Sequence, residues 1–506
     1  MTVDPQVIIV GSGPAGVSAA WPLVRAGVRV LMLDAATGPV AASPAAESAA
    51  AFRADPERWR YQFGGDLAGL AAGGDRSPKF ATPLARSVGA DYAEALGLQT
   101  RGFFAAGALA RGGLSTLWGA LAAEPPVSDL AEFPGGAAGM RPCFDAVRAR
   151  IGVPEPTAAA ITSEAARRVF ARLQGRIAVE PAPNAVLDAP RDGRLACAHT
   201  GLCLWGCSRR AIYDAADELP LLRRFATFAY RPGHRVTRLY ADGDRHGLEV
   251  EAGGARLTFR AGTVLLAAGT IATAALALPR LGLAGRPAPL LTNPAAATAF
   301  VVPGLIGAAL PDQSFSLGQL FYRLPVEESG IPPWAAAGVL YGGDALPLEL
   351  IASRLPLSRP VALRLARALA PALVMATCYL PGGFSRNRIT VGEGSVSIEG
   401  ETPPATRRRL RDAVRDLTRA IVPAALPLPG ATSILEPGAD AHYAGVLPMG
   451  GAGPFSSGDL GEIGKGLHVV DGAGLPSLSS THPTLTIMAN ATRIGERVAG
   501  RVGGTA

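Results

Sequence analysis

The chain has 506 residues, of which 48% are hydrophobic and 18% are charged, so it can bury a large core and is not a disordered protein. Its 48 basic and 41 acidic residues give a net charge of +7. The basic residues are scattered, which predicts a solvated basic surface and no nucleic-acid partner. Five cysteines exclude a disulfide scaffold and favour a reducing compartment.

Targeting and membrane signals are the next features to consider. The N-terminal residues enter a strand-like run without a basic region or a cleavage site, so we expect no signal peptide. The most apolar long segment, Val361–Leu380, contains Arg364, Arg367 and Pro371. We therefore predict a core or interfacial helix there, with contact to a membrane surface left open, and no integral membrane span. Together these features predict a cytoplasmic protein.

The first elements along the chain form a β-loop-α-β unit. A β-branched strand at Gln6–Val10 leads through a glycine-rich loop into a helix that extends to Ala26, and a second strand follows at Val28–Leu33. The loop has the G-x-G-x-x-G pattern of a dinucleotide-binding site, in the residues Gly11, Ser12, Gly13, Pro14, Ala15 and Gly16.

Each part of this loop has a physical role. Gly11 allows a tight turn, Gly13 lets the backbone approach a pyrophosphate, and Gly16 permits close packing of helix against strand. The helix N-terminus then favours the phosphates, and Asp34 at the end of the second strand is placed to bind ribose hydroxyls. No second glycine-rich unit follows in the sequence, which favours a flavin enzyme that takes its electrons from the substrate.

Later elements follow from hydrophobic periodicity and turn residues. We predict a helix at Glu164–Leu173, antiparallel strands at Arg235–Tyr240, Gly247–Ala252 and Arg256–Arg260, a buried strand at Thr263–Ala268 with a helix at Ile271–Leu278, a surface helix at Pro404–Ile421, a strand at Leu467–Asp471 and a terminal helix from Thr484 to about Val502.

The composition changes between about residues 290 and 435, where Pro-rich connectors alternate with apolar runs. This change indicates a second domain inserted into the first. We predict a cofactor-binding domain in residues 1–290, with insertions at about 60–195, a substrate-binding domain in 291–435, and a return to the first domain in 436–506.

Five segments, in order and spread over nearly the whole chain, resemble the glucose–methanol–choline (GMC) family of FAD-dependent oxidoreductases. They are VIIVGSGPAG (Val7–Gly16), ARGGLSTLWGA (Ala110–Ala120), TVLLAAGTIATAALAL (Thr263–Leu278), HYAGVLPMGG (His442–Gly451) and LHVVDGAGLPSLSSTHPTLTIMANATRIGERVAG (Leu467–Gly500). GGLSTLW together with THPTLT is closest to the pyranose-oxidase-like branch. The resemblance implies an α/β (α+β) fold, with a Rossmann-type FAD-binding domain and an inserted, sheet-based substrate-binding domain.

The resemblance also implies further cofactor contacts. It places Asp471 and Gly472 near the flavin and its ribityl chain, Val236 at the adenine, and Gly269 close to the dinucleotide. The loop after Ala110 would pass close to the flavin, and the terminal helix would point its N-terminus at the flavin ring. The residues involved are Gly112, Gly113, Ser115, Thr116, Pro483 and Thr484.

Two residues depart from that branch. Leu117 stands where relatives often have a histidine bonded covalently to the flavin, and Gly119 stands where they have a threonine near the flavin. Leucine has no atom able to form such a bond. We therefore expect FAD to be bound non-covalently.

Two histidines are the catalytic candidates. Alcohol oxidation needs a base for the hydroxyl proton, and histidine suits that task near neutral pH. His442 matches the family's catalytic histidine, and His482 matches the second position, which hydrogen-bonds the substrate oxygen. An ordinary loop histidine and a helix N-cap are the respective alternatives. The remaining histidines, His199, His234, His246 and His468, are interpreted as structural or surface groups.

Three cysteines, Cys197, Cys203 and Cys207, lie close together with His199 between them. Their spacing gives only one pair suited to tetrahedral zinc and too few thiolates for an iron–sulfur cluster. We predict a structural cysteine loop and no metal site.

These observations predict a flavoprotein that oxidises a primary or secondary alcohol to a carbonyl, with a sugar or polyol as the favoured substrate and with oxygen or another carrier reoxidising the flavin. One alternative is the same fold running another reaction of a biosynthetic pathway, such as a lyase or desaturase reaction. A second alternative is a non-enzymatic FAD-binding protein.

Overall fold

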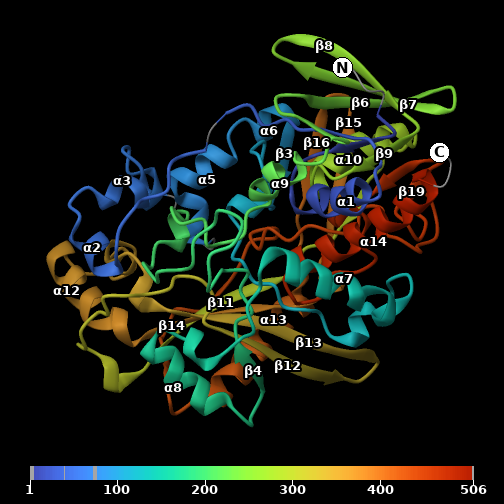
Figure 1. Ribbon diagram of the computed structural model, residues 1–506. Coiled ribbons are helices and arrows are strands. Elements are labelled where there is room, and N and C mark those ends of the chain that lie inside the picture. Colours follow the sequence, from blue (N-terminus) through green and yellow to red (C-terminus); the bar gives the residue numbers. More distant parts are fainter. Residues whose placement is uncertain (1–4, 39, 72–76, 504–506) are drawn as a thin grey trace.

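The structure is a computed structural model that describes residues 5–38, 40–71 and 77–503. Within these residues the strands form four sheets (Figure 1). The predicted α/β (α+β) fold class is confirmed, because a largely parallel sheet of Rossmann type is combined with a larger antiparallel sheet. Helices surround both; their bounds are α1 Pro14–Arg25, α2 Ala49–Ala54, α3 Arg58–Phe63, α4 Ala68–Ala71, α5 Pro83–Val88, α6 Tyr92–Ala95, α7 Gly136–Ile151, α8 Glu164–Leu173, α9 Leu219–Leu222, α10 Thr270–Arg280, α11 Leu348–Ala352, α12 Arg359–Leu369, α13 Pro404–Ile421 and α14 Thr484–Gly503.

The six-stranded sheet carries the glycine-rich motif. In spatial order its strands are β19 (Glu462–Gly464), β20 (Leu467–Val469), β9 (Thr263–Leu266), β1 (Val7–Val10), β2 (Val30–Leu33) and β5 (Phe228–Arg231). All neighbours except β19 and β20 pair in parallel. Alternate residues of β1 enter two different cores, Val7 and Ile9 with α1 and α14, and Ile8 and Val10 with α10. Both faces are therefore covered, which explains the uniformly apolar strand sequence.

The seven-stranded sheet is mostly antiparallel and comes largely from the inserted region. Its order is β17 (Leu426–Pro427), β11 (Ala295–Val301), β14 (Leu373–Tyr379), β13 (Ile331–Gly342), β12 (Leu320–Glu328) and β4 (Ala178–Pro181), with β18 (Ser433–Ile434) pairing β11. Helices α8 and α13 lie near this sheet in the lower part of Figure 1, and α13 buries Leu410, Leu417 and Ile421 in a shared core. Two elements of the first 290 residues, α8 and β4, thus belong with this sheet.

Two smaller sheets complete the strands. One contains β10 (Ala288–Leu290), β15 (Asn387–Gly392), β16 (Ser395–Glu399) and β3 (Leu98–Arg101); the other contains β6 (Arg235–Asp242), β7 (Arg245–Ala252) and β8 (Ala255–Ala261). The predicted antiparallel strands at 235–260 are therefore confirmed. The predicted helices at 164–173 and 404–421 have the bounds expected, whereas the strands at β2, β9 and β20 are each about two residues shorter than predicted.

The prediction for Val361–Leu380 is wrong in its second half. Helix α12 ends at Leu369, and after Pro371 the chain becomes the central strand β14. This strand is bonded on both sides, to β11 and to β13. A short apolar run that is buried on both faces cannot be distinguished from a buried helix by periodicity alone, which is why the strand was missed. Among the helices in the described part of the chain, none is both long and apolar enough to cross a membrane.

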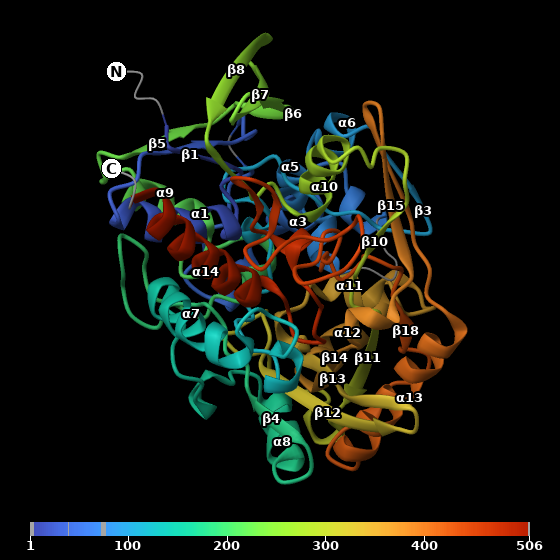
Figure 2. The same ribbon diagram turned by 90° about the vertical axis from the view of Figure 1, so that its right-hand side faces the viewer.

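Helices α1 and α14, from opposite ends of the chain, lie side by side (Figure 2). Their close approach depends on Gly495 of α14. A Cβ placed on Gly495 would lie 2.6 Å from the carbonyl oxygen of Ala19 and 2.8 Å from Cγ of Pro22. The crossing therefore leaves no space for a side chain at this position.

Gly495→Ala should lower the stability of the protein by about 1–3 kcal/mol, because a methyl group there overpacks the crossing. Gly500→Ala is the matched control, since Gly500 lies in the same helix and a Cβ added there would meet open space. It should raise stability by about 0.5–1 kcal/mol, because alanine favours helix more than glycine does. Thermal unfolding followed by circular dichroism measures both, and equal midpoints would contradict the packing argument.

Candidate active site

One cavity extends from the glycine-rich loop to the two predicted catalytic histidines. Its volume is about 1290 Å³, which exceeds the roughly 300–1000 Å³ typical of pockets for small ligands and leaves room for a dinucleotide together with a substrate. Every predicted site residue lines it except Gly16, Gly112 and Thr116. The cavity thus gathers residues from both ends of the chain and from the inserted sheet.

The glycine-rich loop lies between β1 and α1, against the end of β9. A Cβ on Gly11, whose φ is +105°, would collide with the carbonyl oxygen of Ala267, and a Cβ on Gly16 would collide with that of Gly11. Gly13 is different, because a Cβ there would meet only the Gly112 oxygen, at 3.9 Å, and Gly13 lines the cavity. Two glycines therefore serve packing, and the middle one leaves the backbone open to a ligand.

Asp34 follows β2, and three donors hold its carboxylate. Oδ2 accepts hydrogen bonds from the hydroxyls of Ser12 and Tyr230, the latter at 2.9 Å, and Oδ1 accepts one from the N–H of Ala36 at 3.1 Å. Each carboxylate oxygen has two lone pairs, so Oδ1 retains one for a hydroxyl in the cavity. This geometry is compatible with ribose binding.

The second pair of glycines approaches the first loop. The N–H of Gly112 donates to Ser12 Oγ at 3.1 Å, and a Cβ on Gly113 would lie 3.4 Å from Cα of Gly13. Both glycines have positive φ, which L-residues adopt rarely. The loop therefore packs against the glycine-rich motif, and both Gly13 and Gly113 line the cavity.

The hydroxyl of Ser115 links this loop to the segment around Asp214 by hydrogen bonds. It lies 2.6 Å from the carbonyl oxygen of Gly112 and 3.1 Å from Asp214 Oδ1, and it accepts a hydrogen bond from the N–H of Ala215 at 2.9 Å. The Thr116 hydroxyl lies 3.4 Å from the carbonyl oxygen of Arg111. The hydroxyls of Ser115 and Thr116, which were predicted to lie near the flavin, thus both have partners within the protein.

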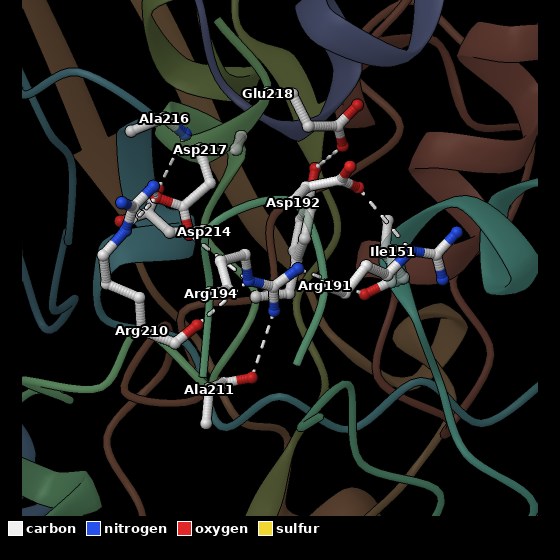
Figure 3. Close-up of polar contacts among 12 residues, drawn as sticks. Ile151, Arg191, Asp192, Arg194, Arg210, Ala211, Asp214, Ala216, Asp217 and Glu218 are labelled. Carbon is white, nitrogen blue, oxygen red and sulfur yellow. Dashed lines mark hydrogen bonds and ion pairs between the residues drawn. The ribbon is translucent and has the colours of Figure 1, made fainter. Parts of the chain in front are cut away.

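Next to Asp214, whose Oδ1 accepts a hydrogen bond from the N–H of Ala216, a polar network lies behind the loop (Figure 3). Its centre is Arg194, whose guanidinium donates to the carbonyl oxygens of Arg210 at 2.9 Å and Ala211 at 3.0 Å and lies 3.5 Å from Asp217. Burial raises the pKa of Asp214 to about 6 and also raises that of Asp217. The guanidinium groups of Arg210 and Arg194 both lie against Asp217 and partly offset the effect of burial on its pKa.

Asp471 connects two of the predicted cofactor segments. Its Oδ2 accepts from the N–H of Gly269 at 2.9 Å and from the Thr273 hydroxyl at 2.5 Å, and its Oδ1 accepts from the N–H of Ala473 at 3.0 Å. Burial raises the pKa of this carboxyl to about 6. The segments after β9 and β20 are thereby fixed next to each other at the cavity.

The two predicted catalytic histidines lie together at the other end of the cavity. The ring centroids of His442 and His482 are 4.7 Å apart, and Tyr379 of β14 packs against both, at 5.6 Å and 5.1 Å. Pro483 and Thr484, at the start of α14, also line this region. The N-terminus of the long helix therefore faces the cavity beside the histidines.

Asn293 and Asp440 contact His442 and were not predicted. Nδ1 of His442 lies 2.9 Å from Asn293 Oδ1 and 3.6 Å from Asp440 Oδ2. The N–H of Asn293 donates to Asp440 Oδ2 at 2.8 Å. Asp440 precedes His442 by only two residues, so its place in the sequence could have indicated a contact with His442. Asn293 is 149 residues away from His442, and its place in the sequence gave no such indication. Because Nδ1 is engaged, Nε2 is the ring nitrogen that remains for a substrate.

Burial determines the protonation of both histidines. It lowers the pKa of His482 to about 4, and burial together with the neighbouring His482 lowers the pKa of His442 well below its usual value. Because a histidine is neutral above its pKa, both imidazoles are uncharged at neutral pH. A neutral imidazole offers one lone pair to accept a proton and one N–H to donate a hydrogen bond.

Lys79 is a further cavity residue that sequence reasoning missed. Its side chain is buried, with only 8% of the residue exposed, and Nζ donates to the carbonyl oxygen of Trp118 at 2.6 Å. Burial lowers its pKa to about 8. One signal was available: the basic residues of the chain are almost all arginines, and Lys79 is one of two lysines.

The cysteine loop packs as an apolar element. Cys197, Cys203 and Cys207 contact a buried cluster that contains Phe315 and Leu317. Burial raises the pKa of Cys197 to about 12 and also raises that of Cys203, so both thiols are protonated at neutral pH. Among the described residues, no group of three or more His, Cys, Asp or Glu side chains is arranged to hold a metal ion.

Comparisons with known proteins agree with this geometry. Residues 4–48, which contain the glycine-rich loop and Asp34, match the family described as an FAD binding domain. This match supports FAD as the dinucleotide of the cavity. The glycine loop open at Gly13 and the spare lone pair of Asp34 fit such a cofactor.

The fold of the chain is similar to that in the crystal structure of pyridoxine 4-oxidase from Mesorbium loti. The TM-score is 0.62 at 16% sequence identity, over 98% of this chain and 99% of that one. The comparison with curated protein sequences gives no match. The structural likeness thus establishes the fold over nearly the whole chain.

Arg194→Ala should destabilise the protein by about 1–3 kcal/mol, because it leaves the carbonyl oxygens of Arg210 and Ala211 without their donor, although Arg210 still pairs with Asp217. The side chains of Arg194 and Asp217 are 6% and 13% exposed. Arg238→Ala is the control: its ion pair with Glu249 is 65% and 40% exposed and should contribute about 0–1 kcal/mol. Urea unfolding measures the stability of both variants, and similar midpoints would show that Arg194 does not stabilise the protein.

Proposed function

We propose that this protein is an FAD-dependent oxidoreductase of GMC type that oxidises a primary or secondary alcohol to a carbonyl compound. The observation that carries the proposal is the pair of neutral imidazoles, His442 and His482, lining the same cavity as the glycine-rich loop. The FAD binding domain match supports the cofactor. The name of the structural neighbour, pyridoxine 4-oxidase, agrees with an oxidase reaction.

His442 is the proposed base. Its Nε2 has no hydrogen-bond partner among the described residues, and its low pKa keeps it unprotonated at neutral pH, so it can take the hydroxyl proton of the alcohol. When bound, FAD would supply the acceptor for the hydride from the substrate carbon. His442 would take the hydroxyl proton, so that both hydrogens lost by the alcohol are accounted for and a carbonyl compound results.

His482 is proposed to orient the substrate oxygen. Its Nδ1 is buried and has no hydrogen-bond partner among the described residues, so this nitrogen is available to a bound molecule. With its pKa near 4 it stays neutral and acts as a hydrogen-bond donor or acceptor rather than as a charge. The N-terminus of α14 beside it favours negative charge at this end of the cavity, by about 0.3–1 kcal/mol.

The cofactor is proposed to be held without a covalent bond. The loop residues 11–15 would receive the phosphates, Asp34 the ribose, and the backbone at Val236 the adenine, while Gly16 packs the helix against the loop. The segments around Gly113, Gly269 and Asp471 would line the path towards the flavin. Leu117 lines the cavity and packs against Leu84 and Val88, and its side chain has no nucleophilic atom. Oxygen or another carrier is the proposed electron acceptor.

The lining next to the histidines favours an alcohol on an apolar body. Ala297, Ala299 and Met375 lie on paired strands with Thr377 and Tyr379, and all of them line the cavity. The Thr377 hydroxyl already contacts the backbone of Val339. A sugar or polyol, the substrate favoured by the sequence, would leave several hydroxyls unpaired against this wall. We therefore propose an alkyl or aromatic alcohol.

His442→Ala should retain bound FAD and lose flavin reduction by alcohols about 10²–10⁴-fold, because the base is removed while the dinucleotide segments are untouched. Anaerobic mixing with a panel of alkyl, aromatic and sugar alcohols, followed by loss of the yellow colour, measures the rate. His246→Ala is the control, since His246 is also buried but does not line the cavity. A His442→Ala protein that is reduced at the wild-type rate would refute the assignment, and a wild-type flavin that no alcohol reduces would favour a lyase.

Acid precipitation of the purified protein should release all of its flavin into the supernatant, because Leu117 cannot form a covalent bond. The absorbance of the supernatant compared with that of the native protein measures the released fraction. Flavin fluorescence that remains on the protein band in a denaturing gel would contradict non-covalent binding.

A further inference from the structure

We propose that Asn293 and Asp440 form a positioning pair for His442, which rests on the role of His442 as the base proposed above. Asn293 holds His442 in the tautomer whose Nε2 is unprotonated, and the carboxylate of Asp440 stabilises the imidazolium that forms when Nε2 takes the alcohol proton. Neither residue belongs to the five sequence segments that resemble the GMC family.

The orientation of the Asn293 amide follows from its surroundings. Its Nδ2 lies 2.8 Å from two backbone carbonyl oxygens, those of Leu380 and Ser479. Carbonyl oxygens only accept hydrogen bonds, so the NH₂ group must face them and Oδ1 must face His442. The opposite orientation would place Oδ1 against both carbonyl oxygens inside a buried site, where Asn293 is only 2% exposed.

This orientation determines the proton on His442. Because Oδ1 of Asn293 only accepts, the contact of 2.9 Å requires that Nδ1 of His442 carries the hydrogen. A neutral imidazole has one N–H, so Nε2 is then the nitrogen with the lone pair. The amide thereby selects the tautomer that a base needs.

Asp440 is placed to respond when His442 gains a charge. Its side chain is 1% exposed, Oδ2 lies 3.6 Å from Nδ1 of His442, and Oδ1 has no hydrogen-bond partner among the described residues. The N–H of Asn293 holds Oδ2 in this position. A carboxylate at this distance in a buried site favours the imidazolium over the neutral ring.

The titration of Asp440 should make the rate of flavin reduction depend on pH. Burial raises the pKa of Asp440 to about 7, whereas that of His442 lies well below its usual value. Among the described titratable groups, Tyr379 and Tyr443 interact with the carboxyl and have pKa values that burial raises, and His482, whose pKa is near 4, packs on His442. Flavin reduction should therefore increase as the pH rises through about 7, because Asp440 then becomes charged and can assist His442.

The first test observes the tautomer directly and does not depend on turnover. The FAD-loaded protein is labelled with ¹⁵N-histidine, and His442 is assigned by the signals that disappear in His442→Ala. We expect a protonated Nδ1 and an unprotonated Nε2 in the wild type, and a shift towards protonated Nε2 in Asn293→Ala. Asn293→Asp keeps an oxygen towards Nδ1, and its second oxygen, protonated in this buried site, can donate to the carbonyl oxygen of Leu380 or Ser479, so this variant should retain the wild-type tautomer.

Asn387→Ala is the matched control for these variants. Asn387 is buried to a similar degree, and its Nδ2 also donates, to Thr292 Oγ1 at 2.9 Å, but it does not contact His442. Its removal should leave the His442 signals unchanged. A wild-type His442 protonated at Nε2, or an unchanged tautomer in Asn293→Ala, would overturn the role of Asn293, whether or not any alcohol reduces the flavin.

The second test measures flavin reduction by an alcohol between pH 5.5 and 9. Asp440→Asn has nearly the same shape as the wild type, keeps an oxygen for the N–H of Asn293 and cannot ionise. It should lose the increase around pH 7 and reduce the flavin roughly 10–100-fold more slowly at pH 8, with little change in the half-saturating alcohol concentration. A variant that keeps the wild-type pH profile would overturn the role of Asp440.

Discussion

The close backbone packing around Gly11 and Gly16 determines the shape of the proposed dinucleotide-binding site. No side chain fits between Gly11 and the end of β9, or between Gly16 and Gly11, so β1, β9 and the start of α1 are held in direct contact. Their parallel strands end at one edge of the sheet, and the segments that follow these strands meet there. Asp471 then bonds to Gly269 across 202 residues of sequence. Most of the proposed cofactor site follows from this single edge.

Burial of the opposite end of the cavity has a different consequence. Removing His442 and His482 from water keeps both neutral, which suits a base but makes the charged form after proton transfer expensive. In our proposal, Asn293 and Asp440 offset this cost from the Nδ1 side of His442. Asn293 donates to two backbone carbonyl oxygens, so the orientation of the His442 ring depends on backbone positions in the inserted region and near the C-terminus.

Local patterns in the sequence were sufficient for the elements that carry the motifs. The β-loop-α-β unit at the N-terminus, the helix at 404–421 and the antiparallel strands at 235–260 are all visible as periodicity with turn residues between them. The strand at 373–379 was missed because a strand buried on both faces has no alternation to detect. Asn293 and Lys79 were missed for another reason: their roles exist only after distant segments meet, and nothing in their immediate sequence marks them.

The inserted sheet forms a part of the cavity wall that is separate from the proposed reacting end. His442 and His482 come from the C-terminal segments, whereas Ala297, Ala299 and Met375 come from β11 and β14. In a β-sheet alternate residues face the same side, so the register of these two strands brings their small and flexible side chains to the cavity together. Substitutions on this face can change the shape of the wall without moving Tyr379, which lies at the histidine end of the same strand. Substrate preference can therefore vary while the arrangement around His442 is kept.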